Sequence, residues 1–111
     1  MRGYNCLCTI SQFTGSATNK TYAQLAANVK VMIAPASGDI VVLYPDIPID
    51  KLFSFVIRTN TFTDILPASK ISVTDGFGSE VTNGQTFIVK QVIQRNKIMG
   101  NFIIAGVCAK L

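Results

Sequence analysis

KISVTDGFGSEVTNGQTFIVKQVIQRNKIMGNFIIAGVCAKL, residues 70–111, is the stretch that decides the fold. Its first part contains Asp75-Gly76 and Asn83-Gly84, and each pair can supply the positive φ that a tight turn between strands requires. The sequence therefore predicts a hairpin here.

The second part of this stretch predicts two more strands. Residues 86–94, TFIVKQVIQ, are dense in β-branched and aromatic side chains, and residues 95–100, RNKIMG, separate them from a last apolar run at 101–111. Few charges interrupt the apolar runs, which is typical of strands covered on both faces. Such burial implies a closed barrel, a sandwich or a neighbouring subunit.

The whole chain has the size and composition of one folded domain. It has 111 residues, of which 49% are hydrophobic and only 14% are charged, and its mean hydropathy is +0.38. These values exclude a disordered chain. Because a protein this small normally needs many charges on its surface, we expect partners to cover part of its apolar surface.

The charge of the chain is weakly basic, with a formal net charge of +4. The basic residues are scattered along the sequence, and only Lys90, Arg95 and Lys97 come close to a cluster. These three are the candidate nucleic-acid contacts. The alternative is a solvated surface of modest positive charge.

The lack of a recognisable targeting signal and the number of cysteines predict a protein made in the cytoplasm. The N-terminus lacks the apolar core of a secretory signal, and no apolar run is long enough to span a bilayer. The three cysteines, Cys6, Cys8 and Cys108, are an odd number, which fits a reducing compartment and buried thiols. A disulfide between two copies of the chain is the alternative.

The rest of the chain adds further strands and one candidate helix. Residues 4–13 alternate apolar and polar side chains, which predicts a strand or, with residues 1–20, an extended arm that pairs with a neighbour. Helical spacing in TYAQLAANV, residues 21–29, indicates a short helix. Strands are predicted over residues 28–35 and 52–58, because one face of each is apolar.

Residues 37–51 are the oddest segment. An apolar run, residues 40–44, lies between Gly38 and the closely spaced Pro45 and Pro48, and the prolines remove two backbone donors. One interpretation is a long excursion, which in a compact domain is usually functional. The other is a core strand over residues 40–44 followed by a proline-rich connection.

The predicted fold is all-β: a small barrel or sandwich of about six strands over residues 1–111, with long loops and at most one short helix. The chain has no histidine, so the usual general base and metal ligand are missing, and its six carboxylates are spread singly. Three cysteines alone are a poor match for a zinc site. We therefore expect no enzyme, no cofactor and no metal.

The chain resembles the head closure, or stopper, proteins of the tailed-bacteriophage neck. In those small barrels, a strand, a Gly-containing turn and an aromatic-x-Val strand precede a terminal strand. Here the pattern reads Lys70-Ile71, then NGQTFIV at 83–89, then residues 102–108, and VMIAPAS at 31–37 is also similar. Residues 75–84, DGFGSEVTNG, depart from the pattern because they are longer than the usual turn.

The resemblance implies a virion protein, assembled in the host cytoplasm, that forms a dodecameric ring between the portal with its adaptor and the tail. It also implies that a loop of each subunit narrows the channel and holds packaged DNA, with no membrane partner. That loop corresponds to residues 37–51, and its apolar run makes the following residues candidates for a channel or oligomer contact: Asp39, Ile40, Val41, Val42, Leu43 and Tyr44. Association of this run by strand addition is expected.

Two alternatives stay open. One is a tail-terminator or other tail-completion ring. The other is an OB-like protein that binds single-stranded nucleic acid, with phosphate contacts from Lys90, Arg95 and Lys97 and base stacking on phenylalanines such as Phe53 and Phe87.

Overall fold

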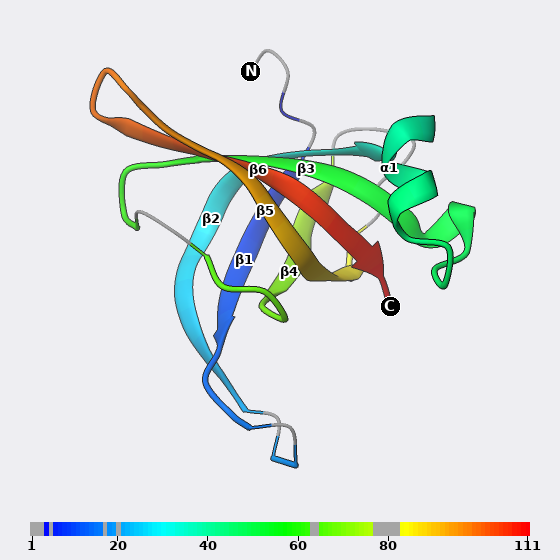
Figure 1. Cartoon of the computed structure of the whole chain (residues 1–111). Helices are drawn as coiled ribbons and strands as arrows, with labels where there is room; N and C mark the ends of the chain where they lie inside the picture. Colours follow the sequence, from blue (N-terminus) through cyan, green and yellow to red (C-terminus); the bar gives the residue numbers. More distant parts are fainter. Residues whose placement is uncertain (1–3, 5, 17, 20, 63–64, 77–82) are drawn as a thin grey trace.

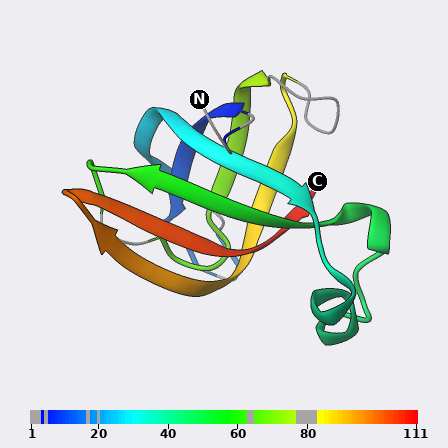
Figure 2. The same cartoon turned by 90° about the horizontal axis from the view of Figure 1, so that it is seen from above.

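The computed structural model describes residues 4, 6–16, 18–19, 21–62, 65–76 and 83–111. Within them, six strands form one closed antiparallel barrel in the spatial order β1-β2-β3-β6-β5-β4 (Figure 1 and Figure 2). The strands are β1 (Cys6–Phe13), β2 (Tyr22–Pro35), β3 (Leu52–Thr59), β4 (Lys70–Gly76), β5 (Thr86–Ile98) and β6 (Asn101–Lys110). The predicted all-β fold is confirmed, and of its two predicted architectures, barrel and sandwich, the barrel is correct.

The first strand closes the barrel. β1 pairs with β2 on one side and with β4 on the other, so that Cys6 lies opposite both Val31 and Gly76. Of the two expectations for this segment, a strand or an arm reaching a neighbour, the structure has a strand inside its own barrel.

Inward-facing side chains fill the barrel. In β3, Phe53, Phe55 and Ile57 are buried and alternate with outward-facing residues, as the sequence predicts. Phe87 of β5 packs edge-on against Phe53, with ring centroids 5.3 Å apart. Each fully buried large apolar side chain stabilises the fold by roughly 1.5–3 kcal/mol, so this interior is the main source of stability.

β2 is a long strand with a bend, and the predicted helix over residues 21–29 is wrong. Tyr22 lies opposite Phe13 in the β1–β2 hairpin, and their rings meet edge to face at 5.5 Å. Asn28 adopts a positive φ of 55°, next to a register shift in the pairing with β1. This bulge turns the strand from β1 toward β3. Cross-strand packing therefore overrides the helical spacing.

Asn83-Gly84 lies where the chain joins the β4–β5 ladder, because the backbone N–H of Gly84 donates a 2.9 Å hydrogen bond to the carbonyl of Val73. Gly84 has the predicted positive φ, 87°, and the side-chain oxygen of Asn83 accepts a hydrogen bond of 2.7 Å from the backbone N–H of Gly76. Gly76 itself belongs to β4, so only the second of the two predicted turn pairs supplies a positive φ. The remainder of the unusually long DGFGSEVTNG segment, residues 77–82, lies outside the described residues.

β5 and β6 continue beyond the barrel as a projecting hairpin, residues 93–103, which we call the arm (Figure 1, upper left). The prediction that residues 95–100 form a separator is wrong, because β5 runs to Ile98 and β6 starts at Asn101. Only Met99 and Gly100 turn the chain, with φ values of 49° and 83°. Two positive φ values match a type I′ turn, whose twist suits a hairpin.

Two irregularities in β5 let it curve along β6. The β5–β6 register shifts between Val89 and Gln91 and again between Val92 and Gln94. Gly106 of β6 lies at this curve, opposite Val92. A Cβ on Gly106 would overlap the carbonyl oxygen of Gln91 and lie 3.0 Å from its carbonyl carbon, so the two strands approach too closely for any side chain.

Candidate functional site

The segment between β2 and β3 leaves the barrel and contains a short helix, α1 (Gly38–Leu43), and a 3₁₀ turn, η1 (Ile49–Lys51). Residues 37–51 are called the excursion below. Of the two sequence interpretations, the excursion is correct and the core strand over residues 40–44 is wrong, because residues 38–43 are helical. The backbone N–H groups of Ile40 and Val41 both donate to the carbonyl of Ser37, so they are already used inside the turn.

The helix explains why strand addition through the apolar run is the wrong mode of association. Strand addition needs extended backbone with free donors and acceptors, and this backbone is coiled on itself. In this conformation, residues 38–43 present side chains rather than a strand edge to a partner.

The predicted loop residues separate into two groups. Ile40, Val41 and Tyr44 are half-buried, whereas Asp39 is exposed. Two further apolar residues of α1, Val42 and Leu43, are 78% and 67% exposed. One side of the helix is therefore partly shielded from solvent, and the other presents aliphatic side chains and a carboxylate to solvent.

Tyr44 fastens the excursion to the barrel wall. Its hydroxyl donates a 2.6 Å hydrogen bond to Oε1 of Gln91, a residue next to the first irregularity of β5. Leu52 and Val107 lie on outward-facing positions of β3 and β6 and yet are fully buried. Leu52 directly follows η1, and its carbonyl accepts a 3.1 Å hydrogen bond from the backbone N–H of Ala36, so this position of β3 lies at the base of the excursion.

We expect Tyr44→Phe to loosen the excursion without unfolding the barrel. The variant loses one neutral hydrogen bond near the surface, which contributes about 1 kcal/mol. Limited proteolysis should cut residues 37–51 several times faster, while the urea midpoint of the barrel falls only slightly. Gln91→Leu should have the same effect, and Tyr4→Phe is the control. Unchanged cleavage in both variants would contradict the anchoring role.

The arm carries the other large group of exposed apolar side chains, and sequence reasoning missed it. Ile93, Ile98 and Met99 are 58%, 49% and 94% exposed. The sequence does contain a sign of the arm: the strand pattern of β5 continues up to Met99-Gly100. A Met-Gly pair is easily overlooked as a hairpin turn, because Asn-Gly is the usual pair in a two-residue turn.

The three candidate nucleic-acid residues do not form one site. All three are exposed on β5, but Lys90 lies beside Lys70 and Tyr22, whereas Arg95 and Lys97 belong to the arm. Seven residues of strand separate Lys90 from Lys97, about 20 Å at the usual rise. The Lys97 ammonium lies 5.6 Å from the ring centre of Phe102.

The phenylalanines proposed as a stacking platform are inside the barrel. Phe53 is 8% exposed, and Phe55 and Phe87 are fully buried. They cannot stack on bases, and their role is core packing. Phe102, on the arm, is half-buried.

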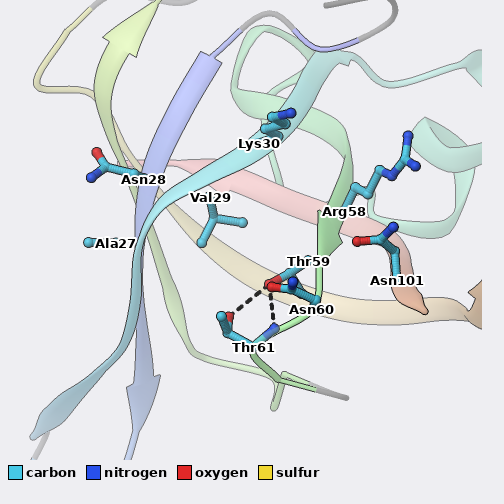
Figure 3. Close-up of a pocket in the computed structure, with 9 residues that line it drawn as sticks. All are labelled: Ala27, Asn28, Val29, Lys30, Arg58, Thr59, Asn60, Thr61 and Asn101. Atoms are coloured by element: carbon cyan, nitrogen blue, oxygen red, sulfur yellow. Dashed lines mark hydrogen bonds between the residues drawn. The ribbon is translucent and has the colours of Figure 1, made fainter.

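A polar hollow of about 400 Å³ lies between β2 and the end of β3 (Figure 3). Lys30 and Arg58 contribute to its lining from directly opposite positions of the two strands. Thr59 and Thr61 share a 2.8 Å hydrogen bond on the same side, and Asn28, Asn60 and Asn101 complete its polar lining. The positive charges of Lys30 and Arg58 repel each other across the two strands. An anionic group in the hollow would relieve this repulsion, so the hollow is suited to an anion.

The three cysteines are free thiols buried in the barrel. Cys8 donates to the sulfur of Cys6 at 3.5 Å, and this hydrogen bond, with burial, raises the pKa of the Cys8 thiol. Burial, reinforced by neighbouring Cys6, raises the pKa of the Cys108 thiol. Within the described residues, no group of three or more His, Cys, Asp or Glu side chains is placed to hold a metal ion.

We expect these thiols to resist alkylation in the folded protein. Thiolate is the reactive form, and the raised pKa values of Cys8 and Cys108 suppress it. The hydrogen bond from Cys8 lowers the pKa of Cys6, so that thiol is protected by its complete burial alone. At pH 8 a chromogenic disulfide reagent should register almost no thiol in the native state and all three in 6 M guanidinium chloride. Rapid reaction of one equivalent under native conditions would contradict the buried placement.

Comparisons with known protein families, with curated proteins and with solved structures found no match to this chain. None of the helices in the described part of the chain has the length and apolar character needed to cross a membrane.

Proposed function

We propose that this protein is a structural ring subunit of a tailed-bacteriophage neck, of the head closure type, joining the portal and its adaptor to the tail. The observation that carries the proposal is the excursion, which leaves a closed barrel, is fastened to its wall by Tyr44, and presents Val42 and Leu43 to solvent. Repeated around a ring, such a segment would narrow the channel that holds packaged DNA, with its aliphatic side chains against the neighbouring subunit. We assign no catalytic role to the protein.

The composition of the surface supports a protein that works between copies and partners. Exposed large aliphatic side chains are gathered on the excursion and the arm, rather than scattered singly. The described interior of the barrel is packed mainly with apolar side chains and the buried thiols.

The experiment that tests this proposal is assembly with the portal and adaptor of the same phage. We expect sedimentation to give a discrete ring, with twelve subunits as the family resemblance implies, and electron microscopy to place it below the adaptor. A ring that instead caps the tail tube and ignores the adaptor would favour a tail-terminator role. A protein that stays monomeric alone and in every mixture would contradict both.

Single-stranded nucleic-acid binding is a second candidate, favoured by the hollow that Lys30 and Arg58 line and by Lys97 on the arm. Phosphate contacts of this kind release counterions, so binding should fall steeply with salt. Filter binding of a labelled oligonucleotide at 50 and 200 mM salt separates the candidates. We expect no retention at either concentration. Salt-sensitive retention that Lys97→Gln and Arg58→Gln both weaken would favour this second function.

A further inference from the structure

Exposed apolar side chains are concentrated at two opposite ends of the molecule. Eight large hydrophobic residues are exposed in the described part of the chain, and six of them belong to two groups. We call Val42, Leu43 and Ile49, with the acidic residues of the excursion, the excursion patch; Ile93, Ile98 and Met99, with Lys97, form the arm patch. Figure 1 and Figure 2 both place α1 and the tip of the arm at opposite ends of the barrel.

The position of Met99 is unfavourable for the folded chain on its own. It is 94% exposed, and its φ of 49° lies in the left-handed region. A non-glycine side chain there destabilises the turn by about 1–2 kcal/mol, and Asn or Gly is the usual choice in a type I′ turn. A large apolar side chain held at an exposed turn is therefore better explained by a partner that buries it.

The charges of the two ends are complementary. Residues 37–51 contain three aspartates and one lysine, a formal charge of −2, and Asp39, Asp46 and Asp50 are all exposed. Residues 93–103 contain Arg95 and Lys97 and no acidic residue, a formal charge of +2. Opposite charges around apolar contacts favour docking of one end on the other and disfavour pairing of like ends.

We propose that the excursion patch of one copy binds the arm patch of the next copy. The two patches differ and lie at opposite ends, so the contact is heterologous and propagates head to tail, closing into a ring when the rotation between copies allows it. The inference rests on the proposed ring-forming function and identifies the contact that builds the ring. Leu43, Val42 and Met99 form its apolar centre, with Asp46 and Lys97 at its rim.

Complementation between two single variants tests this contact. Leu43→Asp removes the excursion patch, and Met99→Asp removes the arm patch; each variant alone should be monomeric in sedimentation velocity, with self-association weakened about tenfold or more. Mixed together, they keep one good patch each and should form a 1:1 dimer that grows no further. Leu66→Asp, which changes a 48% exposed residue in neither patch, should assemble like the wild type.

Met99→Asn provides a second test, because it should raise the stability of the fold while weakening assembly. In the non-assembling Leu43→Asp background it should raise the melting temperature by a few degrees, because Asn suits the turn. In the otherwise wild-type chain it should weaken assembly. A variant that stabilises the fold and still assembles normally would overturn the role of Met99.

The outcomes separate the contact from the function. Wild-type rings that survive both Leu43→Asp and Met99→Asp would overturn the proposed contact and leave the ring function standing. Dimers formed by either variant alone would overturn head-to-tail pairing in favour of like-to-like pairing. A wild-type chain that never associates, with or without portal and adaptor, would overturn the ring function itself.

Discussion

Replacing Gly106 with alanine is expected to destabilise the barrel by about 3 kcal/mol or more, among the largest effects of any single methyl group in this chain. The added Cβ would overlap the backbone carbonyl of Gln91, and backbone atoms cannot swing aside as a flexible side chain can. β5 and β6 would have to separate where β5 curves. Urea denaturation should give a much lower midpoint with little change in slope.

Gly38→Ala is the matched control for this substitution. A Cβ on Gly38 has no neighbour within 4 Å, its φ is not in the left-handed region, and it lies in the first turn of α1. The same added methyl should therefore be neutral or slightly stabilising, since alanine is the better helix former. If Gly106→Ala were as harmless as Gly38→Ala, the close approach of β5 and β6 would be wrong.

Phe87→Ala is expected to destabilise the barrel by about 3–5 kcal/mol, the range for removing a phenyl group from a packed core. Phe87 is fully buried, and its ring packs edge-on against Phe53 at 5.3 Å. Small domains have only about 5–15 kcal/mol of stability, so the variant would be partly unfolded near 37 °C. Thermal melting followed by circular dichroism measures this directly.

Phe102→Ala is the control with the same chemical change. Phe102 lies on the arm and is half-buried, so its removal leaves no closed cavity. We expect a loss of no more than about 1 kcal/mol. Equal losses for Phe87→Ala and Phe102→Ala would mean that the arm packs as tightly as the barrel interior, in contradiction to the observed exposure.

Alternation of apolar side chains was sufficient to predict an all-β barrel or sandwich, and the pairing of β1 with β4 decides for the barrel. Phe53, Phe55 and Ile57 recur at every second position, and the Gly84 turn carries its own local signal. The strand over residues 21–29 was not predictable, because Tyr22 and Leu25 have helical spacing and only the pairing with β1 decides their conformation. Local patterns thus identified strands that bury one face and missed the one bent by a bulge.

The candidate site was less predictable because long-range contacts form it. Ile40, Val41 and Val42 are β-branched and favour strands, yet they lie in a helix whose end is anchored by Tyr44 to Gln91, 47 residues away. The opposed Lys30 and Arg58 likewise meet only through strand register. The proline-rich composition of residues 37–51 did indicate an unusual segment, but not its shape.

Closure of the barrel has a consequence for how so apolar a chain behaves at high concentration. Where the barrel closes, each strand has a neighbour on both sides, so open rows of main-chain donors and acceptors are confined to the outer edge of β5 in the arm and to the free edge of β2 over residues 22–29. The barrel thereby restricts the growth of fibrils by strand stacking to these two short edges, even though 49% of residues are hydrophobic. Concentrated solutions should accordingly show association that reverses on dilution, without the thioflavin fluorescence of amyloid.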